Sequence, residues 1–340
     1  MKRIRTAILG YGRSGSTLHA GPIEKLDAFE PVAVCDIDPA RLRLATERFG
    51  CPVYGDYHEM LARAQPDLVC VITRNDQHCA MACDCLRAGA HVLVTKPWAA
   101  NQSEAERMMA AARASNRLLL PWLPARWGSG FLRLKALLAA QTIGRVFLIR
   151  RTVASFGTRS DWQTRRSCAG GYLLNWGPHI VDPAVLLGGA RVRSVFARLG
   201  QIINPGDVED LFLAVLTLDN GTIVQAEYTI SPAAMPGWMV QGDRGTIVVT
   251  GDNLTLVRAT PVRPDDPTKC NTMNPEAPSQ SDETIGGKPY GDEFVIYEAV
   301  SETLLNGQPF PVPPEDALEL TRIFDAIRES DAANQVVALS

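Results

Sequence analysis

The chain has 340 residues, which as a soft guide corresponds to about two domains. Hydrophobic residues make up 46% and charged residues 21%, the balance of an ordinary folded protein, so extended disorder is not expected. The 34 Lys and Arg against 37 Asp and Glu give a net charge of −3. That balance argues against a nucleic-acid binder or a membrane-surface protein, because both need a basic excess.

No stretch of the sequence reaches the ~20 consecutive apolar residues of a membrane span. The first ten residues are typical of a strand that ends in a glycine turn, not of a signal peptide. We therefore expect a cytoplasmic protein. Its 8 cysteines show no paired spacing, and Cys79, Cys83 and Cys85 fall in one predicted helix without a second cluster. This pattern favours reduced thiols and no bound metal.

Short β-rich runs alternate with helical runs over the first third of the chain. Strands are predicted at 4–9, 32–35, near 53, 68–73, 91–94 and 117–121, and helices at 14–29, 39–49, 57–63, 77–88 and 102–115. Such alternation predicts a parallel sheet with helices on both faces. We assign residues 1–122 to this first domain.

The rhythm changes after about residue 125, and residues 123–340 are expected to form an α+β domain with a mainly antiparallel sheet. Helices are predicted at 130–140, 172–187, 290–305 and 315–328, and strands at 145–156, 192–202, 209–218, 222–230, 237–242, 245–249 and 254–258. The pair Asn220-Gly221 indicates a hairpin between two of these strands. Residues 260–289 are rich in turn-forming residues and predict a long surface loop. The helix at 315–328 is expected to pack back toward the first domain.

A glycine-rich motif follows the first predicted strand and opens a helix, which is the context of a dinucleotide-binding loop. The motif G-x-G-x-x-G consists of Gly10, Tyr11, Gly12, Arg13, Ser14 and Gly15. Asp36, at the end of the next strand, can accept hydrogen bonds from a ribose, which favours NAD over NADP. Arg13 could instead stack on adenine or meet a 2′-phosphate, so NADP stays open. The plainer alternative is a glycine turn with an acid that caps a helix.

Three further motifs carry a family likeness. They are T-R-N-D-Q-H at 73–78, A-G-A-H-V-L-V-T-K-P at 88–97 and G-G-Y-L-L-N-W-G-P-H at 170–179. With the glycine loop they resemble the Gfo/Idh/MocA oxidoreductase family, including its glucose-fructose oxidoreductase-like members, over residues 3 to about 330. Residues 12–22 look most like its inositol dehydrogenase-like branch. The resemblance implies an α/β protein with an N-terminal Rossmann dinucleotide-binding domain, a C-terminal domain with a large open, mainly antiparallel sheet, and a homodimer or homotetramer formed through that sheet.

The resemblance also implies which residues carry the function. Those assigned to the cofactor, besides the glycine loop and Asp36, are Thr73, Arg74, Asn75, His78, Thr95, Lys96 and Pro97. The family's catalytic Lys, helix Asp and His fall on Lys96, Asn175 and His179. Thr95 stands where the family has Glu, Arg74 where it has Pro, and Asn175 where it has Asp. The last exchange touches the chemistry.

These residue types suit a dehydrogenase. Lys96 can stabilise a developing alkoxide, and His179 is the plausible general acid or base. Asn175 lies four residues before His179, on the same helical face, and can orient a substrate hydroxyl. Because Asn carries no charge, we expect His179 to titrate lower than in relatives with Asp. A surface lysine and a backbone-bonded histidine are the plainer alternatives.

Other residues are expected to contact the substrate. Trp162 could stack on a sugar face, and Arg165 or its neighbour Arg166 could bind a carboxylate, although a solvated basic loop is equally plausible. Arg126 could line the same cleft or serve packing alone. His78 could hold the cofactor loop or cap its helix.

The sequence thus predicts an NAD(P)-dependent oxidoreductase that moves a hydride between nicotinamide and a carbinol of a sugar, inositol or related polyol. Two rivals stay open: a glycosidase or lyase with resident NAD, and a non-catalytic NAD(P)-binding ligand sensor. The substrate, the reaction direction and the choice between dimer and tetramer are not predicted.

Overall fold

The computed structural model describes residues 3–262, 268 and 277–339. The chain divides into two compact units. Unit 1 comprises Met1–Pro124, Asp161–Asn175 and Gly291–Asp325, and unit 2 comprises Ala125–Ser160, Trp176–Tyr290 and Ala326–Ser340. The assignment of functional domains to 1–122 and 123–340 stays a prediction.

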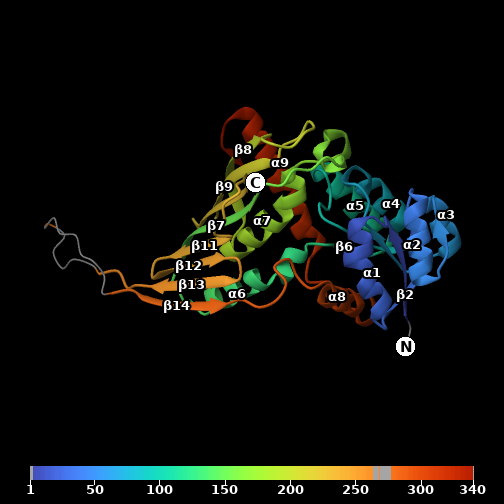
Figure 1. Cartoon of the computed structure of the whole chain (residues 1–340), viewed down its shortest axis with the longest axis horizontal. Helices are drawn as coiled ribbons and strands as arrows, with labels where there is room; N and C mark the ends of the chain where they lie inside the picture. The colour runs from blue at the N-terminus through green and yellow to red at the C-terminus, as the bar shows by residue number, and fades with distance from the viewer. Residues whose placement is uncertain (1–2, 263–267, 269–276, 340) are drawn as a thin grey trace. The chain divides into compact units, whose positions relative to one another are not determined.

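Unit 1 is built on a parallel sheet of six strands in the order β3-β2-β1-β4-β5-β6 (Figure 1). Its strands are β1 (Ile4–Leu9), β2 (Phe29–Cys35), β3 (Val53–Tyr54), β4 (Leu68–Val71), β5 (His91–Val94) and β6 (Leu119–Pro121). The strand order reverses between β1 and β4, and in such sheets ligands bind beyond the carboxyl ends of the strands at this point. The predicted Rossmann fold is confirmed.

Helices cover this sheet. They are α1 (Ala20–Lys25), α2 (Pro39–Phe49), α3 (Tyr57–Ala64), α4 (His78–Arg87), α5 (Gln102–Ser115) and, from the far end of the sequence, α8 (Glu293–Asn306). Tyr297 of α8 is fully buried, with its ring 5.4 Å from that of Phe29 and 5.5 Å from that of Trp122. One late helix therefore completes the core of the first unit.

The helix after the glycine loop is shorter than the predicted 14–29. A π-helical turn, Gly15–His19, leads into α1, and the chain becomes extended at Leu26. Phe29 begins β2 and is fully buried beside Ile4 of β1. The apolar Phe29 therefore belongs to the strand and not to the helix.

Unit 2 is built on a mixed sheet of nine strands in the order β14-β13-β12-β11-β7-β10-β9-β8-β15. Its strands are β7 (Val146–Ser155), β8 (Val192–Gly200), β9 (Leu211–Leu218), β10 (Ile223–Ile230), β11 (Trp238–Gly242), β12 (Gly245–Thr250), β13 (Asn253–Arg258), β14 (Ser279–Thr284) and β15 (Val337–Ala338). Among the described strands of this sheet, only β7 and β10 pair in parallel, so the predicted mainly antiparallel sheet is confirmed. The hairpin predicted at Asn220-Gly221 joins β9 to β10.

Three helices accompany this sheet: α6 (Ser129–Ala139), α7 (Tyr172–Gly188), which begins in unit 1, and α9 (Pro314–Ala333), which ends in unit 2. A Cβ atom on Gly188 would lie 2.3 Å from a methyl carbon of Leu218, so a residue without a side chain lets α7 pack closely on β9. The loop predicted over 260–289 is wrong at 279–284, which form β14 against β13. Residues 263–267 and 269–276 of that loop lie outside the described residues.

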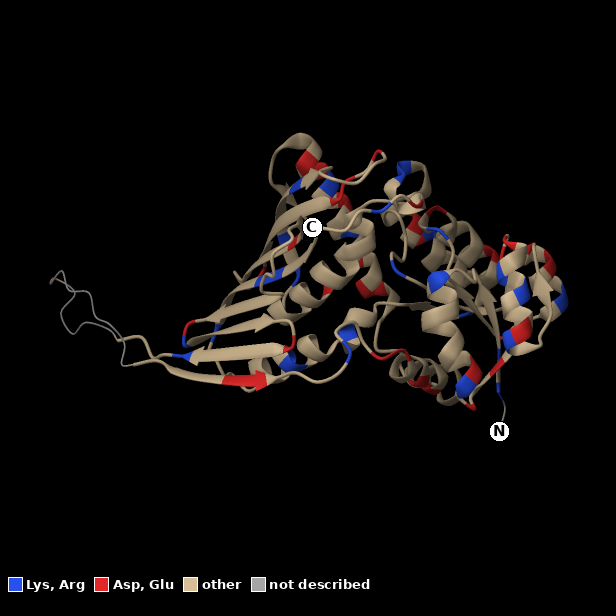
Figure 2. Ribbon diagram, in the orientation of Figure 1, with Lys and Arg blue, Asp and Glu red and all other residues tan. Residues whose placement is uncertain are grey.

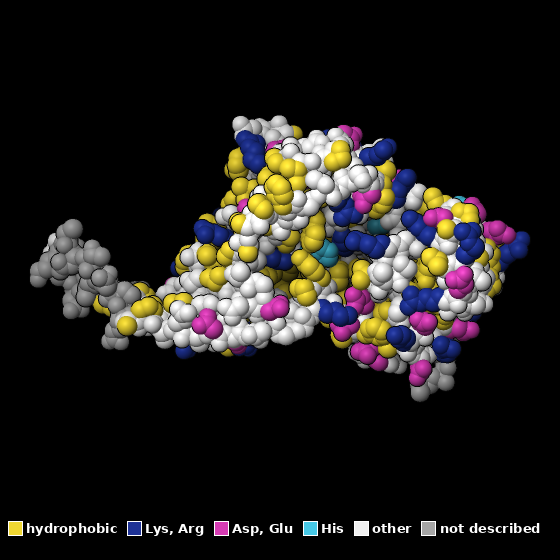
Figure 3. Space-filling view, viewed as in Figure 1, with side chains coloured by type: hydrophobic (Ala, Val, Ile, Leu, Met, Phe, Trp, Pro, Cys, Tyr) yellow, Lys and Arg dark blue, Asp and Glu magenta, His cyan; other side chains and the backbone are white. Residues whose placement is uncertain are grey.

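Charges of both signs are spread over each unit (Figure 2). In the view of Figure 3, Lys and Arg alternate with Asp and Glu over the helices of unit 1, and hydrophobic side chains gather over the sheet of unit 2. Within the described part of the chain, no helix combines the length and apolarity that a membrane crossing needs. The same residues bring no three His, Cys, Asp or Glu side chains together as metal ligands.

Candidate cofactor-binding and active site

The glycine loop has the close contacts that a dinucleotide site requires. Gly10 has φ +99°, and a Cβ there would lie 2.5 Å from the carbonyl oxygen of Ile72. A Cβ on Gly15 would lie 2.2 Å from the carbonyl oxygen of Gly10. At Gly12 the nearest atom is the tip of the Arg41 side chain at 3.5 Å, so the backbone stays open to a ligand. The loop therefore fits a pyrophosphate at the start of a helix.

Asp36 lies directly after β2, beside this loop. Its carboxylate is buried and accepts hydrogen bonds from the backbone N–H groups of Tyr11 (2.7 Å) and Asp38 (2.9 Å). An acid at this place suits the ribose diol of NAD. Arg13 is exposed, and Arg41, which the sequence did not single out, lies 3.5 Å from the same carboxylate.

Two more residues of the glycine loop have defined surroundings. The ring of Tyr11 is buried edge-on against Phe49, with centroids 6.0 Å apart. Ser14 is half-buried at the start of the π-helical turn. The loop thus offers its backbone, rather than large side chains, to a cofactor.

His78 links the two segments that follow β4 and β5. Its Nδ1 lies 2.8 Å from the carbonyl oxygen of Pro97, and its Nε2 lies 3.1 Å from that of Thr73. Both partners are acceptors, but a neutral imidazole donates only once. Burial lowers the pKa of His78, so the neutral ring donates to one carbonyl, and the shorter distance favours Pro97. His78 therefore bridges the two segments, and its predicted part in holding a cofactor stays a prediction.

The departures from the family pattern have local partners. Thr95 is buried, and its hydroxyl donates to the carbonyl oxygen of Val71 at 3.2 Å. Arg74 forms a two-pronged ion pair with Asp76, at 3.0 and 3.2 Å. Asn75 is buried and donates from Nδ2 to the carbonyl oxygen of Ala169 at 2.7 Å. This bond connects the loop after β4 to the segment before α7.

Lys96 and Asn175 are brought together. The Lys96 ammonium donates to the side-chain oxygen of Asn175 and to its backbone carbonyl, both at 2.8 Å. Lys96 lies two residues after the end of β5 and is half-buried, and Asn175 lies in the first turn of α7. The amide at the family's Asp position thus positions the lysine without neutralising its charge.

The loop with Trp162 and Arg165 folds back on itself just before α7. Gly171 donates to the carbonyl oxygen of Gln163 at 2.9 Å, and a Cβ on Gly170 would lie 2.4 Å from the same oxygen. The glycine pair is therefore required for this close return. Trp162 is half-buried, while Arg165 and Arg166 are exposed.

His179 lies four residues after Asn175 on α7, in the part that belongs to unit 2. It is 9% exposed, and its ring lies 5.0 Å from that of Tyr290 and 5.9 Å from that of Trp176. Trp176 in turn packs on Tyr228, with ring centroids 5.4 Å apart. An aromatic surround of this kind suits the apolar face of a sugar ring.

Arg126 has a fixed partner in unit 2. Its guanidinium binds the Asp182 carboxylate of α7 at 2.9 and 2.7 Å, and both side chains are buried. Such a pair fixes the orientation of a guanidinium. Its predicted substrate contact stays a prediction.

Two residues near His179 were missed by the sequence reasoning. The Tyr290 hydroxyl accepts a hydrogen bond from Arg151, a buried arginine of β7. Arg151 also donates to the carbonyl oxygen of Gly237 at 2.9 Å. The Arg151 guanidinium stacks 4.7 Å from the centre of the Trp238 ring, and burial lowers its pKa. The available signal was the position of Arg151 within the predicted strand 145–156.

Comparison with known proteins gives the family. Residues 4–121 match the family described as "Oxidoreductase family, NAD-binding Rossmann fold", and residues 131–248 match the "GFO/IDH/MocA C-terminal domain". The chain belongs to the Gfo/Idh/MocA oxidoreductase family. It is thus an enzyme, an oxidoreductase with an NAD-binding Rossmann domain, as the sequence predicted.

Three similar proteins show how far the similarity extends along this Gfo/Idh/MocA chain. The uncharacterized oxidoreductase YdgJ of Escherichia coli is 28% identical and covers 73% of this chain and 71% of its own. The scyllo-inositol 2-dehydrogenase (NADP(+)) IolW of Bacillus subtilis is 26% identical over 99% of this chain and 96% of its own. The structure of an NAD-binding protein from Listeria innocua superposes with a TM-score of 0.85 at 26% identity, covering 99% of this chain and 97% of that one.

Proposed function

We propose that this oxidoreductase transfers a hydride between NAD and a carbinol of an inositol, sugar or related polyol. The observation that carries the proposal is the Lys96 ammonium, held at 2.8 Å by the two oxygens of Asn175 just beyond the end of β5. A fixed cation beside the nicotinamide end of a Rossmann site suits an oxygen that gains negative charge. The likeness to an inositol dehydrogenase over nearly the whole chain supports the substrate class.

The residues divide the work as follows. In the oxidative direction the His179 imidazole takes the proton of the substrate hydroxyl, and the Lys96 ammonium donates a hydrogen bond to the same oxygen. Asn175 positions Lys96 and orients the substrate. Bound NAD supplies the hydride chemistry, while the protein supplies position and charge.

We further propose that Trp162, Arg165 and Arg126 contact the substrate. Trp162 offers a ring face to the sugar, and Arg165 offers a guanidinium to a carboxylate where the substrate has one. Arg126, held by Asp182, offers a fixed N–H donor.

We propose NAD as the preferred cofactor, because a buried carboxylate at Asp36 disfavours a 2′-phosphate. The exposed Arg13 and Arg41 leave NADP as the second choice, and the relative from Bacillus subtilis is named as an NADP(+) enzyme. The test below uses both cofactors.

We also propose that the protein assembles as a homodimer or homotetramer through the sheet of unit 2. Phe196, Val215 and Ile223 share the sheet face that points away from α7, where they are 37%, 36% and 41% exposed. Apolar residues in a row on an open sheet face favour a partner surface. The molar mass in solution, measured by light scattering, tests this.

The function is tested by mixing the protein with NAD or NADP and a panel of inositols, aldoses and sugar acids, and following reduced nicotinamide. We expect a signal with one substrate group, and a loss of about 100-fold or more in kcat for Lys96→Ala and His179→Ala. Lys25→Ala and His58→Ala, at exposed positions, serve as matched controls.

Two results would overturn the proposal. Product formation without net change of the cofactor would indicate a resident-NAD glycosidase or lyase. Cofactor binding without any turnover would indicate a ligand sensor.

A further inference from the structure

A pair of cysteines on α4 lies outside the site described above. Cys79 and Cys83 are one helical turn apart, so they share the face of α4 that packs against α5. The Cys79 sulfur lies 2.9 Å from an Nη2 nitrogen of Arg107 and 3.5 Å from the carbonyl oxygen of Glu104, both on α5.

The surroundings of Cys79 favour its thiolate. The residue is the second of α4, where the helix terminus stabilises negative charge, and Arg107 adds a full positive charge in contact. A hydrogen bond from Cys83 and, second to it, the contact with Arg107 lower the pKa of Cys79 more than burial raises it. Because Cys83 donates the hydrogen bond to Cys79, the pKa of Cys83 is raised. Cys79 is therefore the nucleophile of the pair.

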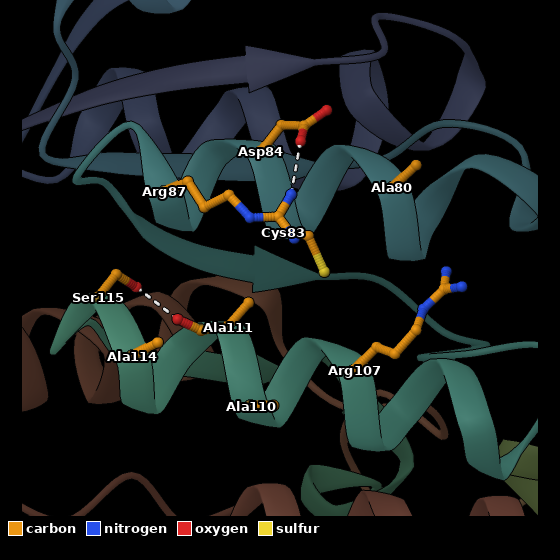
Figure 4. A pocket seen from close by; sticks show the side chains of 9 residues that line it. All are labelled: Ala80, Cys83, Asp84, Arg87, Arg107, Ala110, Ala111, Ala114 and Ser115. Carbon is orange, nitrogen blue, oxygen red and sulfur yellow. Dashed lines mark hydrogen bonds and ion pairs between the residues drawn. The ribbon is translucent and has the colours of Figure 1, made fainter.

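A pocket of about 800 Å³ opens beside the Cys83 sulfur, one helical turn from Cys79. It is lined by Ala80, Cys83, Asp84, Arg87, Arg107, Ala110, Ala111, Ala114 and Ser115. In Figure 4 the Cys83 sulfur and the Arg107 side chain reach into the space between α4 and α5. Cys79 is buried and does not line the pocket, but its sulfur contacts the exposed Arg107, which does. Access of a ligand to the Cys79 sulfur therefore requires the Arg107 side chain to move.

The charge of the pocket wall indicates what it receives. The wall carries two guanidinium groups, of Arg87 and Arg107, and one carboxylate, of Asp84, which pairs with Arg87 at 3.0 Å. The remaining lining is alanine and serine apart from Cys83. Such a wall suits a small molecule with a carboxylate and a short apolar or peptide body.

We propose that Cys79 is a site of reversible thiolation by disulfides of small, carboxylate-bearing thiols. The Cys79 thiolate attacks one sulfur of the disulfide, the old S–S bond breaks, and a new S–S bond forms to Cys79. The other half leaves as a thiolate and takes a proton from water, so no further oxidant is needed. Arg107 activates the sulfur and, once displaced, binds a carboxylate of the attached group.

The test uses the full chain with Cys270→Ser, because Cys270 lies outside the described residues. The probe is dithiobis(nitrobenzoate), a disulfide with two carboxylates, whose release of coloured thiolate is followed between about pH 5.5 and about pH 9. Mass spectrometry of peptides locates the modified residue, and oxidised glutathione serves as a second probe.

We expect one fast-reacting thiol, Cys79, whose reaction rate reaches half of its maximum well below the pH typical of cysteine. We expect this fast reaction to be absent in Cys79→Ser. Arg107→Met should slow it at neutral pH by about tenfold or more and move its pH midpoint upward. Arg113→Met, another exposed arginine of α5, should change neither. Thermal melting of each variant verifies that it is folded.

Three outcomes would overturn the proposal: a fast thiol that persists in Cys79→Ser, a rate indifferent to Arg107→Met, or first modification at Cys83. None depends on dehydrogenase activity, so this test and that of the proposed function fail independently.

Discussion

Replacing Asn175 by Asp tests the electrostatics of the proposed active site. The change puts a carboxylate where an amide oxygen now lies 2.8 Å from the Lys96 nitrogen. An opposite charge in contact shifts a titration by about 1 to 3 pH units, and solvent around the half-buried lysine argues for the low end, about one unit or ~1.4 kcal/mol. The carboxylate favours the ammonium form, so the alkaline limb of activity moves upward. The imidazolium of His179, one turn further on, is favoured too, so the acidic limb also moves upward.

The assay is the pH dependence of kcat/KM for the best substrate of the panel, at saturating cofactor. Asn175→Gln keeps a neutral amide, and Asn116→Asp adds a carboxylate at an exposed position at the end of α5. Neither should move the limbs. Unchanged limbs in a folded, active Asn175→Asp protein would refute both the proposed role of the charged Lys96 as donor to the substrate oxygen and the predicted low titration of His179.

Three further predictions concern cofactor choice and stability. Asp36→Asn should lower the preference for NAD over NADP at least about tenfold, because a hydrogen bond to a charged acceptor contributes about 1.5–3 kcal/mol; kcat/KM with both cofactors measures it. Asp182→Asn should destabilise the protein by about 3–5 kcal/mol in urea unfolding, because it leaves the buried Arg126 without its anion; no loss would mean that water solvates the guanidinium. Burial lowers the pKa of His19 from 6.5 to about 3, so its stabilising neutral state is complete above about pH 6.5 and is lost as the pH falls from there. His19→Gln should flatten the loss of stability between pH 6 and pH 4 by up to about 1.4 kcal/mol per pH unit, and an unchanged slope would exclude His19 as a source of acid sensitivity.

Most of unit 1 and much of the unit 2 sheet could be predicted because they depend on local patterns. The strands alternate with helices, and Gly10 must be glycine because its φ is +99° and Ile72 lies close. Asn220-Gly221 forms its hairpin because the turn needs a positive φ, which Gly221 has at +84°. The sequence signal for each of these features is a short local motif, even where, as at Gly10, the contact itself is with a distant residue.

The features that were missed depend on contacts between distant segments. β14 consists of polar residues without alternation, and it forms by pairing with β13; its Glu283 also binds Arg133 at 2.7 Å. Tyr297 completes the core of unit 1 from a helix more than 160 residues after the last strand of that sheet. No periodicity in the sequence contains such information.

Within unit 1, one segment just before α7 stabilises both Lys96 and the loop that follows β4. Asn75, in the loop after β4, binds the carbonyl oxygen of Ala169 at 2.7 Å, and the glycine pair that follows closes on the carbonyl of Gln163. These bonds fix the segment from which α7 starts, and the first turn of α7 carries the two oxygens that hold Lys96. Asn175 therefore holds the lysine through oxygens that carry no net charge. A lysine that is held in place by uncharged oxygens keeps its positive charge available for a substrate oxygen, whereas a neighbouring carboxylate would partly neutralise it.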